Sequence, residues 1–149
     1  MSTTIQRILV AHDFGDASDA ALTYAIDLAE KLGARVTIVH AYEIPVYGFA
    51  EGVALTADVG GQIRTLTSDA LDRIVHAAAR PGLDLHGMLR QGPAWSEITT
   101  AATEIHADLV VIGTHGRRGL AHALLGSVAE KVVRTSPCPV LTVHGKAKA

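Results

Sequence analysis

Segments with the composition of buried strands alternate along this chain with segments that have the periodicity of helices. Short runs rich in valine, isoleucine and leucine are each followed by a longer stretch in which apolar residues recur every three or four positions. Consecutive parallel strands need such crossover helices, because a tight turn cannot join them. The alternation predicts an α/β fold: a doubly wound, five-stranded parallel sheet with helices on both faces.

The predicted strands cover residues 8–11, 36–40, 83–89, 108–112 and 140–143. The predicted helices are one that follows a cap at Asp16 or Ser18 and ends at Gly33, one from about 59 to 79, one after Pro93, and one from about 127 to 135. Asp16 or Ser18 is the expected N-terminal cap of the first helix. The strand at 83–89 has the least continuous apolar pattern, which indicates a position nearer an edge of the sheet. Residues 41–57 contain a proline and two glycines, and they predict a long loop whose role stays open.

Composition and charge narrow the class of protein. The 149 residues fit one domain spanning 1–149, with a frayed tail at about 145–149. The formal net charge of −2 gives no electrostatic footprint for nucleic acid. The single cysteine, Cys138, excludes an internal disulfide and fits a reducing compartment. No apolar run approaches the roughly 20 residues of a membrane helix, and the first residues lack an apolar signal core. We therefore expect a cytoplasmic protein without a membrane partner.

A glycine-punctuated segment, Gly113-Thr-His-Gly116 through Gly126-Ser127, leads from the end of the fourth strand to the start of the last helix. Backbone N–H groups of such a loop converge on an anion, and the helix dipole favours negative charge there. The spacing is neither that of a Walker loop, which continues Gly-Lys-Ser/Thr, nor the dinucleotide fingerprint G-x-G-x-x-G. The segment predicts a phosphate cradle of another kind.

Structural interpretations of the same residues stay open beside the functional one. Gly113 also suits the end of a strand, and Gly126 also suits the start of a helix. Ser127-Val-Ala-Glu130 has the pattern of a capping box, which accounts for the serine without a ligand but is compatible with one. Asp13, at the end of the first strand, is either a loop residue, a helix cap or a ligand contact.

Two other classes of site are disfavoured. A receiver domain needs a second acid beside Asp13 and a phosphoacceptor aspartate after the third strand, but Phe14 and Gln91 occupy these places. The eight histidines are scattered over different elements without an H-x-x-x-H pair, so we expect no metal site formed by protein ligands alone.

Four segments carry a resemblance to a known family: Ile8-Leu-Val-Ala-His-Asp13-Phe, Asp108-Leu-Val-Val-Ile-Gly-Thr-His-Gly116, Leu125-Gly126-Ser127-Val and Ser136-Pro-Cys-Pro-Val140-Leu-Thr-Val143. Together they resemble the universal stress proteins along essentially the whole chain. The resemblance implies the adenine-nucleotide α-hydrolase-like fold, with strand order 3-2-1-4-5. It also implies the ATP-binding branch of the family, because every glycine motif position is present, and a homodimer through the edge strand Val140–Val143.

The same resemblance implies a binding site for ATP, with Mg²⁺ bridging the phosphates. Its residues are Ala11, His12 and Asp13 beside the nucleoside; Val39, His40 and Ala41 facing the adenine; Ile112, Gly113, His115, Gly116 and Arg117 around the ribose and phosphates; and Gly126, Ser127 and Val128 closing the triphosphate site. His12 departs from the small or proline-containing pair of some members, and we expect it to crowd the base or stack on it.

The function that these residues favour is an ATP-binding stress-response sensor with little or no turnover. Phosphoryl transfer needs a positioned water, a metal and charge stabilisation of the γ-phosphate. The loop offers His115 and Arg117 but no acid with an obvious water-orienting role, so no catalytic residue is assigned. A slow ATPase or adenylate-transferring enzyme on the same fold, and a nucleotide-free interaction module, are the alternatives.

Overall fold

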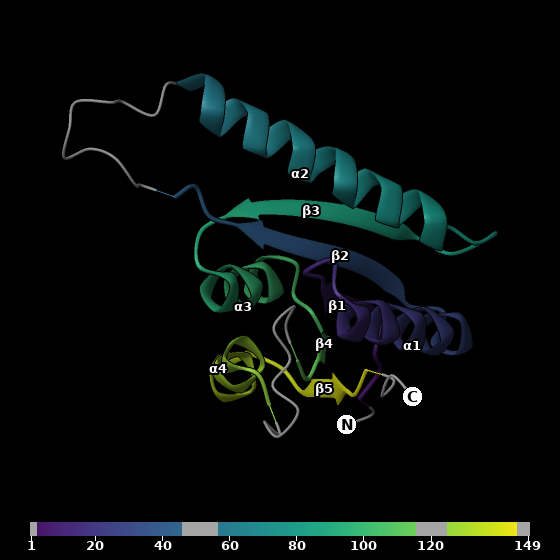
Figure 1. Cartoon of the computed structure of the whole chain (residues 1–149). Helices are drawn as coiled ribbons and strands as arrows, with labels where there is room; N and C mark the ends of the chain where they lie inside the picture. The colour runs from purple at the N-terminus through teal and green to yellow at the C-terminus, as the bar shows by residue number, and fades with distance from the viewer. Residues whose placement is uncertain (1–2, 46–56, 116–124, 146–149) are drawn as a thin grey trace.

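The computed structural model describes residues 3–45, 57–115 and 125–145, in which strands and helices alternate as the sequence predicts (Figure 1). The elements, in chain order, are β1 (Arg7–Ala11), α1 (Asp16–Leu32), β2 (Arg35–Tyr42), α2 (Ala57–Ala78), β3 (Leu85–Gln91), α3 (Ala94–Glu104), β4 (Leu109–Gly113), α4 (Ser127–Thr135) and β5 (Val140–Val143). No helix among the described residues is long and apolar enough to cross a membrane.

The five strands form one parallel sheet in the order β3-β2-β1-β4-β5. The order confirms the prediction, and it places β3, whose apolar pattern is the least continuous, at one edge. The winding direction reverses between β1 and β4, which are hydrogen-bonded neighbours in the middle of the sheet. In open α/β sheets, ligands bind outside the carboxyl ends of the strands at such a reversal.

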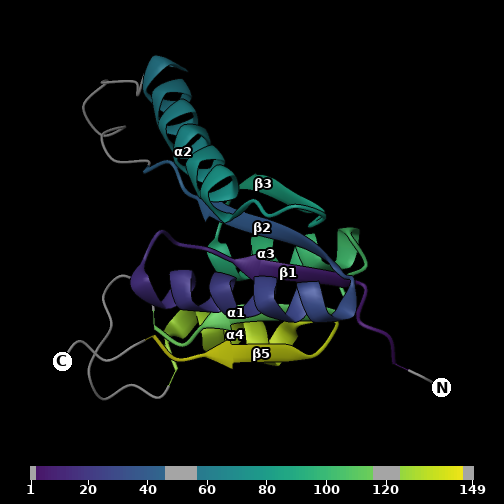
Figure 2. The same cartoon turned by 90° about the vertical axis from the view of Figure 1, so that its right-hand side faces the viewer.

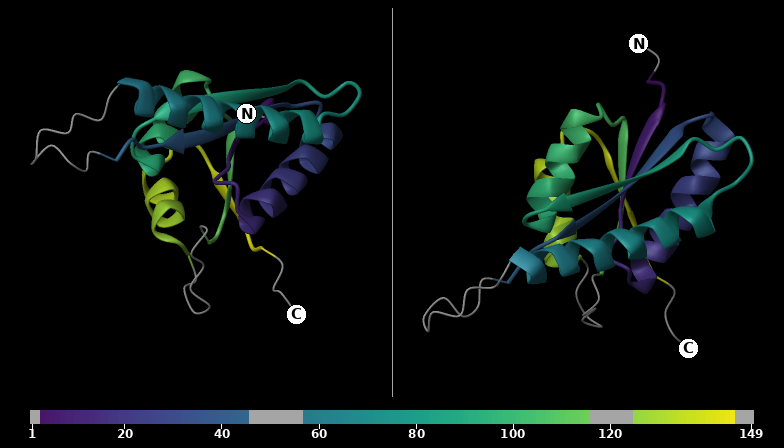
Figure 3. Two further views of the ribbon diagram at one scale, coloured as in Figure 1. Left: turned by 45° about the horizontal axis from the view of Figure 1, so that its top comes forward. Right: turned by 90° about the horizontal axis from the view of Figure 1, so that it is seen from above.

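Helices cover both faces of the sheet. Figure 2 shows α1 in front of the strands and α3 and α4 behind them, and the view from above in Figure 3 separates the same two layers. Side chains of β1 alternate between the two faces, so that Ile8 and Val10 pack toward α1 and α2 while Leu9 and Ala11 pack toward α3 and α4. All residues of β4 are buried. The two central strands therefore have hydrophobic core on both sides, as expected for a parallel sheet.

The second strand is longer than the sequence indicates. Ala41 and Tyr42 were expected at the start of the loop 41–57, but they belong to β2 and pair with Arg90 and Gln91 of β3. Pairing to a neighbour extends a strand beyond its own apolar run, and a single sequence does not reveal that pairing. The rest of that segment, 46–56, lies outside the described residues, as does the tail 146–149.

The predicted helix caps are wrong. The N-cap of α1 is Gly15, not Asp16 or Ser18, and the N-cap of α4 is Gly126, so that Ser127 is already the first helical residue. Each helix therefore begins with a glycine in extended conformation and without a side-chain cap. The capping box is absent, because the Glu130 carboxylate accepts a hydrogen bond from Arg134 one turn later rather than from the helix start.

Candidate functional site

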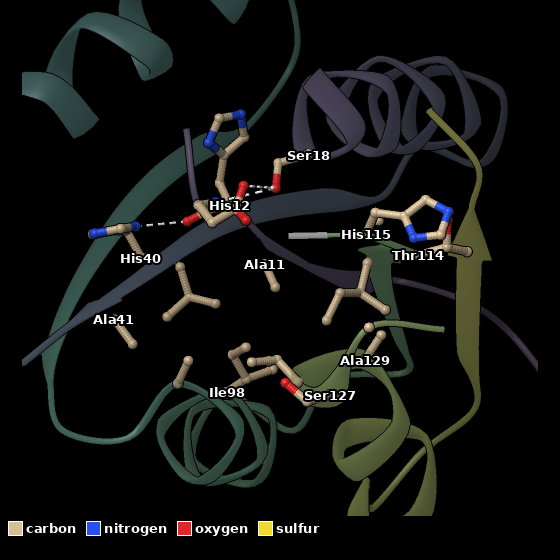
Figure 4. Close-up of a pocket in the computed structure, with 17 residues that line it drawn as sticks. Ala11, His12, Ser18, His40, Ala41, Ile98, Thr114, His115, Ser127 and Ala129 are labelled. Atoms are coloured by element: carbon tan, nitrogen blue, oxygen red, sulfur yellow. Dashed lines mark hydrogen bonds between the residues drawn. The ribbon is translucent and has the colours of Figure 1, made fainter. Parts of the chain in front are cut away.

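A pocket lies at the carboxyl ends of β1, β2 and β4, where the winding direction reverses (Figure 4). It also reaches the first turns of α3 and α4, so that one wall comes from the sheet and the other from these two helices. The apolar part of its lining includes Val39, Ile98, Ile112 and Ala129. A pocket with apolar walls and a few polar groups at one end suits a flat, partly apolar ligand with a polar tail.

Every predicted site residue that the structure describes lines this pocket. These residues are Ala11, His12, Asp13, Val39, His40, Ala41, Ile112, Gly113, His115, Gly126, Ser127 and Val128. The other two predicted residues, Gly116 and Arg117, lie outside the described residues. The fold thus brings together residues from four separate parts of the sequence. Their roles toward a ligand stay predictions.

Sequence reasoning missed part of the lining, namely Ser18, Ala94, Ile98, Thr114 and Ala129. Ile98 was expected only as a core residue of its helix, because its periodicity cannot distinguish a core contact from a pocket wall. Ala94 begins α3, and only the packing of α3 against the end of β2 turns that residue toward the pocket.

Asp13 precedes α1 and is held by hydrogen bonds to the start of that helix. Its Oδ1 accepts hydrogen bonds from the Gly15 N–H at 2.9 Å and from the Ser18 hydroxyl at 2.7 Å, while the Ser18 Oγ accepts the Asp13 N–H at 3.1 Å. Ser18 is buried, so this arrangement is screened from water on one side. The pair fixes the carboxylate of Asp13 at the start of α1. Among the described residues that line the pocket, Asp13 is the only carboxylate.

The ring of His12 does not point into the pocket, where the sequence predicts that it crowds or stacks on a base. Its ring is fully buried and turns away from the pocket toward α1 (Figure 4), where Nε2 lies 2.9 Å from Asp19 Oδ1. Nδ1 accepts a hydrogen bond from the Phe14 N–H at 3.0 Å. Because Nδ1 is an acceptor here, Nε2 carries the proton and its N–H donates a hydrogen bond to the carboxylate of Asp19.

His40 reaches from β2 to the end of β1. Its Nδ1 donates a hydrogen bond to the carbonyl oxygen of His12 over 2.7 Å (Figure 4). The ring packs against Phe14, with 4.2 Å between the two ring centroids. Phe14 itself has a φ of +66°, a left-handed conformation that is rare for a residue with a bulky side chain. Strain of this kind is typical of functional sites.

Thr114 connects the two described ends of the glycine-rich segment. This residue is buried, its N–H donates to the Val143 carbonyl of β5 at 3.0 Å, and its carbonyl accepts the Gly126 N–H. The start of α4 is thereby tied to the end of β4. The first amides of a helix have no partner within the helix, and Ser127, Val128 and Ala129, which provide three of them in α4, line the pocket.

The described residues contain no group of three histidine, cysteine, aspartate or glutamate side chains placed to hold a metal ion. Cys138 lies in the core layer between the sheet and α3–α4, and burial raises the pKa of its thiol. A thiol that stays protonated is a poor nucleophile, which is consistent with a packing role.

Comparison with known proteins finds sequence relatives along most of the chain. The Universal stress protein family profile matches residues 4–144. A universal stress protein of Thermus aquaticus is 34% identical over 93% of this chain and 98% of its own length. One from Methanocaldococcus jannaschii is 33% identical over 93% of this chain and 81% of its own length.

Solved structures resemble the fold. UspA from Lactobacillus plantarum superposes with a TM-score of 0.81 over 93% of this chain and 97% of that chain, at 23% identity. A universal stress protein solved in complex with cAMP has a TM-score of 0.66, covers 96% of this chain and 99% of that chain, and is 29% identical.

Proposed function

This chain belongs to the universal stress protein family, and on that premise we propose that it binds ATP in the pocket at the carboxyl ends of β1 and β4. A related member that is 29% identical has cAMP in its structure, which supports an adenine nucleotide as the class of ligand. The proposal extends this class to the triphosphate because the complete glycine motif, from Gly113 to Ser127, is present in the sequence.

One observation carries the proposal: the main chain of Ala41 faces the pocket. The main-chain groups of even-numbered residues in β2 form hydrogen bonds with β3; for example, the Gly92 N–H donates to the Tyr42 carbonyl. Those of odd-numbered residues form hydrogen bonds with β1; for example, the His12 N–H donates to the Val39 carbonyl. The odd-numbered Ala41 therefore directs its N–H and C=O toward β1, but β1 stops pairing at Ala11. A donor and an acceptor side by side match the N1 and 6-amino groups of adenine.

The opposite end of the pocket suits the phosphates. The N-terminus of α4 presents main-chain amides and the positive end of the helix dipole there. Hydrogen bonds to a charged group contribute roughly 1.5–3 kcal/mol each. Four or five of them, less the costs of association and ordering, leave about −7 to −8 kcal/mol, which corresponds to a micromolar Kd. Gly116 and Arg117, predicted to contribute to this cradle, belong to the part of the chain that the structure does not describe.

Mg²⁺ accompanies the nucleotide in this proposal. The described residues offer no acidic cluster for the ion, so the ion would take its ligands from phosphate oxygens and water, as Mg²⁺ commonly does in nucleotide sites. We assign the protein a sensing role with little turnover. The reason is that Asp13 is the sole carboxylate of the described lining. Because its Oδ1 already accepts hydrogen bonds from Gly15 and Ser18, that oxygen is poorly placed to orient an attacking water.

The proposal is tested on the unmodified protein. Freshly purified protein is denatured, the released small molecules are identified by mass spectrometry, and ligand-free protein is titrated with ATP and with GTP by calorimetry. We expect a released adenine nucleotide and a micromolar Kd for ATP that is tighter than that for GTP. If no nucleotide is released and no heat is measured with ATP, the proposal is wrong. Phosphate release well above background, lost in Asp13→Asn, would overturn only the sensing role.

A further inference from the structure

We propose that His40 and His12 are positioning residues that keep the main chain of Ala41 available to the base. This inference rests on the proposed function, because it explains why the Ala41 N–H and C=O do not pair with β1 and can contact adenine. Both histidines line the pocket, but their ring nitrogens form hydrogen bonds to Asp19 and to the main chain of residues 12 and 14, so the proposed role does not require either ring to touch the ligand.

The sheet itself defines what would happen without these rings. β1 and β2 pair in register from Arg7 with Arg35 to Ala11 with Val39. One further rung of the same parallel ladder would run from the Ala41 N–H to the His12 carbonyl, and from the Phe14 N–H to the Ala41 carbonyl. These two hydrogen bonds would occupy both the N–H and the C=O of Ala41 and leave neither available to a ligand.

Both partners on the β1 side are occupied by imidazole nitrogens instead. The His12 carbonyl accepts its hydrogen bond from His40 Nδ1 at 2.7 Å, and the Phe14 N–H donates to His12 Nδ1 at 3.0 Å. The two histidines therefore cap the end of β1 at the two atoms that would otherwise continue the ladder. A buried main-chain group has to find a partner, and here the side chains supply it.

Neighbouring contacts hold each ring in this role. Asp19 accepts from His12 Nε2 at 2.9 Å, which fixes the tautomer that leaves Nδ1 as an acceptor. Phe14, in its left-handed conformation, packs on the His40 ring and also contacts the ring of His12, whose centroid is 5.6 Å away. The turn that follows β1 is thus built around these rings, which gives the strained backbone of Phe14 a function.

The test compares three variants. His40→Leu keeps apolar volume against Phe14 but removes the donor to the His12 carbonyl. His40→Asn places an amide N–H close to the position of Nδ1 and restores the donor. His86→Leu is the matched control, because it makes the same substitution on β3, where His86 is exposed and hydrogen-bonds to Asp84 away from the pocket.

The readout is discrimination between ATP and inosine triphosphate (ITP). Hypoxanthine, the base of ITP, carries a donor at N1 and an acceptor at C6, the reverse of adenine. It therefore cannot form the two hydrogen bonds with the Ala41 N–H and C=O that adenine can form. We expect the Kd for ITP divided by the Kd for ATP to fall about tenfold in His40→Leu, since one hydrogen bond is worth about that factor. In His40→Asn and His86→Leu this ratio should keep its wild-type value. Equal weakening of both nucleotides in His40→Leu, or no change, would overturn the inference.

A second measurement is independent of any nucleotide. Amide hydrogen exchange of Ala41 is followed by NMR in the ligand-free protein. The wild-type amide should exchange quickly and the His40→Leu amide should be protected, because the released His12 carbonyl then accepts it. A protected Ala41 amide in the wild-type protein would overturn the inference. If the protein binds neither nucleotide, the proposed function fails while the exchange experiment still decides the role of His40.

Discussion

Gly113 lies so close to Ala17 that a Cβ on the glycine would be 2.8 Å from the carbonyl carbon of Ala17 and 2.9 Å from its Cβ. The first turn of α1 thus rests directly on the end of β4, across the position where the winding of the sheet reverses. The same turn holds Asp13 through Ser18. A glycine expected as part of a phosphate cradle therefore also has a packing reason of its own.

Gly113→Ala is expected to lower the free energy of unfolding by about 1–3 kcal/mol, because the new methyl group meets main-chain atoms that cannot move without shifting α1. Urea unfolding followed by circular dichroism measures the change. Gly61→Ala is the matched control: nothing lies within 4 Å of its added Cβ, and it lies inside α2, so it should stabilise the protein by about 0.5–1 kcal/mol. Equal stability of the two variants would contradict the tight packing of Gly113.

Gly126→Val is expected to abolish ATP binding while the fold survives. Gly126 has φ −66° and ψ 161°, which valine adopts without strain, and its N–H bond to Thr114 does not depend on the side chain. A branched side chain at the start of α4 would hold the phosphates away from the helix amides. Calorimetry with ATP measures the loss, and the unfolding midpoint in urea checks the fold. Unchanged ATP affinity in a folded variant would argue against the proposal that the phosphates bind at the start of α4.

Thr142→Pro is expected to convert a homodimer into a monomer. We propose, as the sequence predicts, that two copies pair through β5, an edge strand without a charged residue. The bonds from the Val110 N–H to the Pro139 carbonyl and from the Thr114 N–H to the Val143 carbonyl show that odd-numbered residues of β5 face β4. The N–H of Thr142 therefore points outward, where proline removes a contact between copies but none within the sheet.

Light scattering at tens of micromolar protein measures this change in mass. Leu141→Pro is the control, because its N–H faces β4 and its loss should lower the stability of the folded chain itself. A monomeric wild-type protein, or a Thr142→Pro variant that stays dimeric, would reject pairing through β5.

Asp108 should make the protein acid-sensitive. Hydrogen bonds from the Gln6 N–H and then the Arg7 N–H, both 2.9 Å to Oδ2, hold the pKa of Asp108 below its usual value. A group whose pKa is lower in the folded state than in the unfolded state stabilises the protein when the pH is above the unfolded pKa, which is about 3.9 for aspartate. This stabilisation is lost as the pH falls from that value through the folded-state pKa. Asp108→Asn should cost about 1–2 kcal/mol at pH 7, since a charged acceptor is lost.

Urea unfolding at pH 7, 4 and 2.5 measures this dependence. The difference between wild type and Asp108→Asn should shrink between pH 4 and pH 2.5, because the wild-type carboxylate becomes protonated. A difference that stays constant over this range would show that the charge of Asp108 does not contribute.

Local pattern predicted some parts of the site well and others poorly. The strand ends that carry Asp13 and Gly113 follow apolar runs that can be read directly, and the parallel order then brings the two residues to one edge. The orientation of His12 was predicted wrongly, because the ring is turned by a hydrogen bond to Asp19, which lies one helical turn into α1. Likewise, Ala41 was assigned to a loop, since its pairing partner Arg90 is far away in the sequence.

The periodicity of apolar residues was enough to predict the layered architecture, because it fixes which side each strand and helix buries. The strand order, which brings the ends of β1 and β4 together, was implied by the resemblance to the universal stress proteins and not by the pattern. The packing of the elements sets which polar groups at that edge are already hydrogen-bonded and which face the pocket. A main-chain donor or acceptor bonds to a group that packing brings within reach, and here His40 and His12 occupy the two atoms that would have continued the β1–β2 ladder.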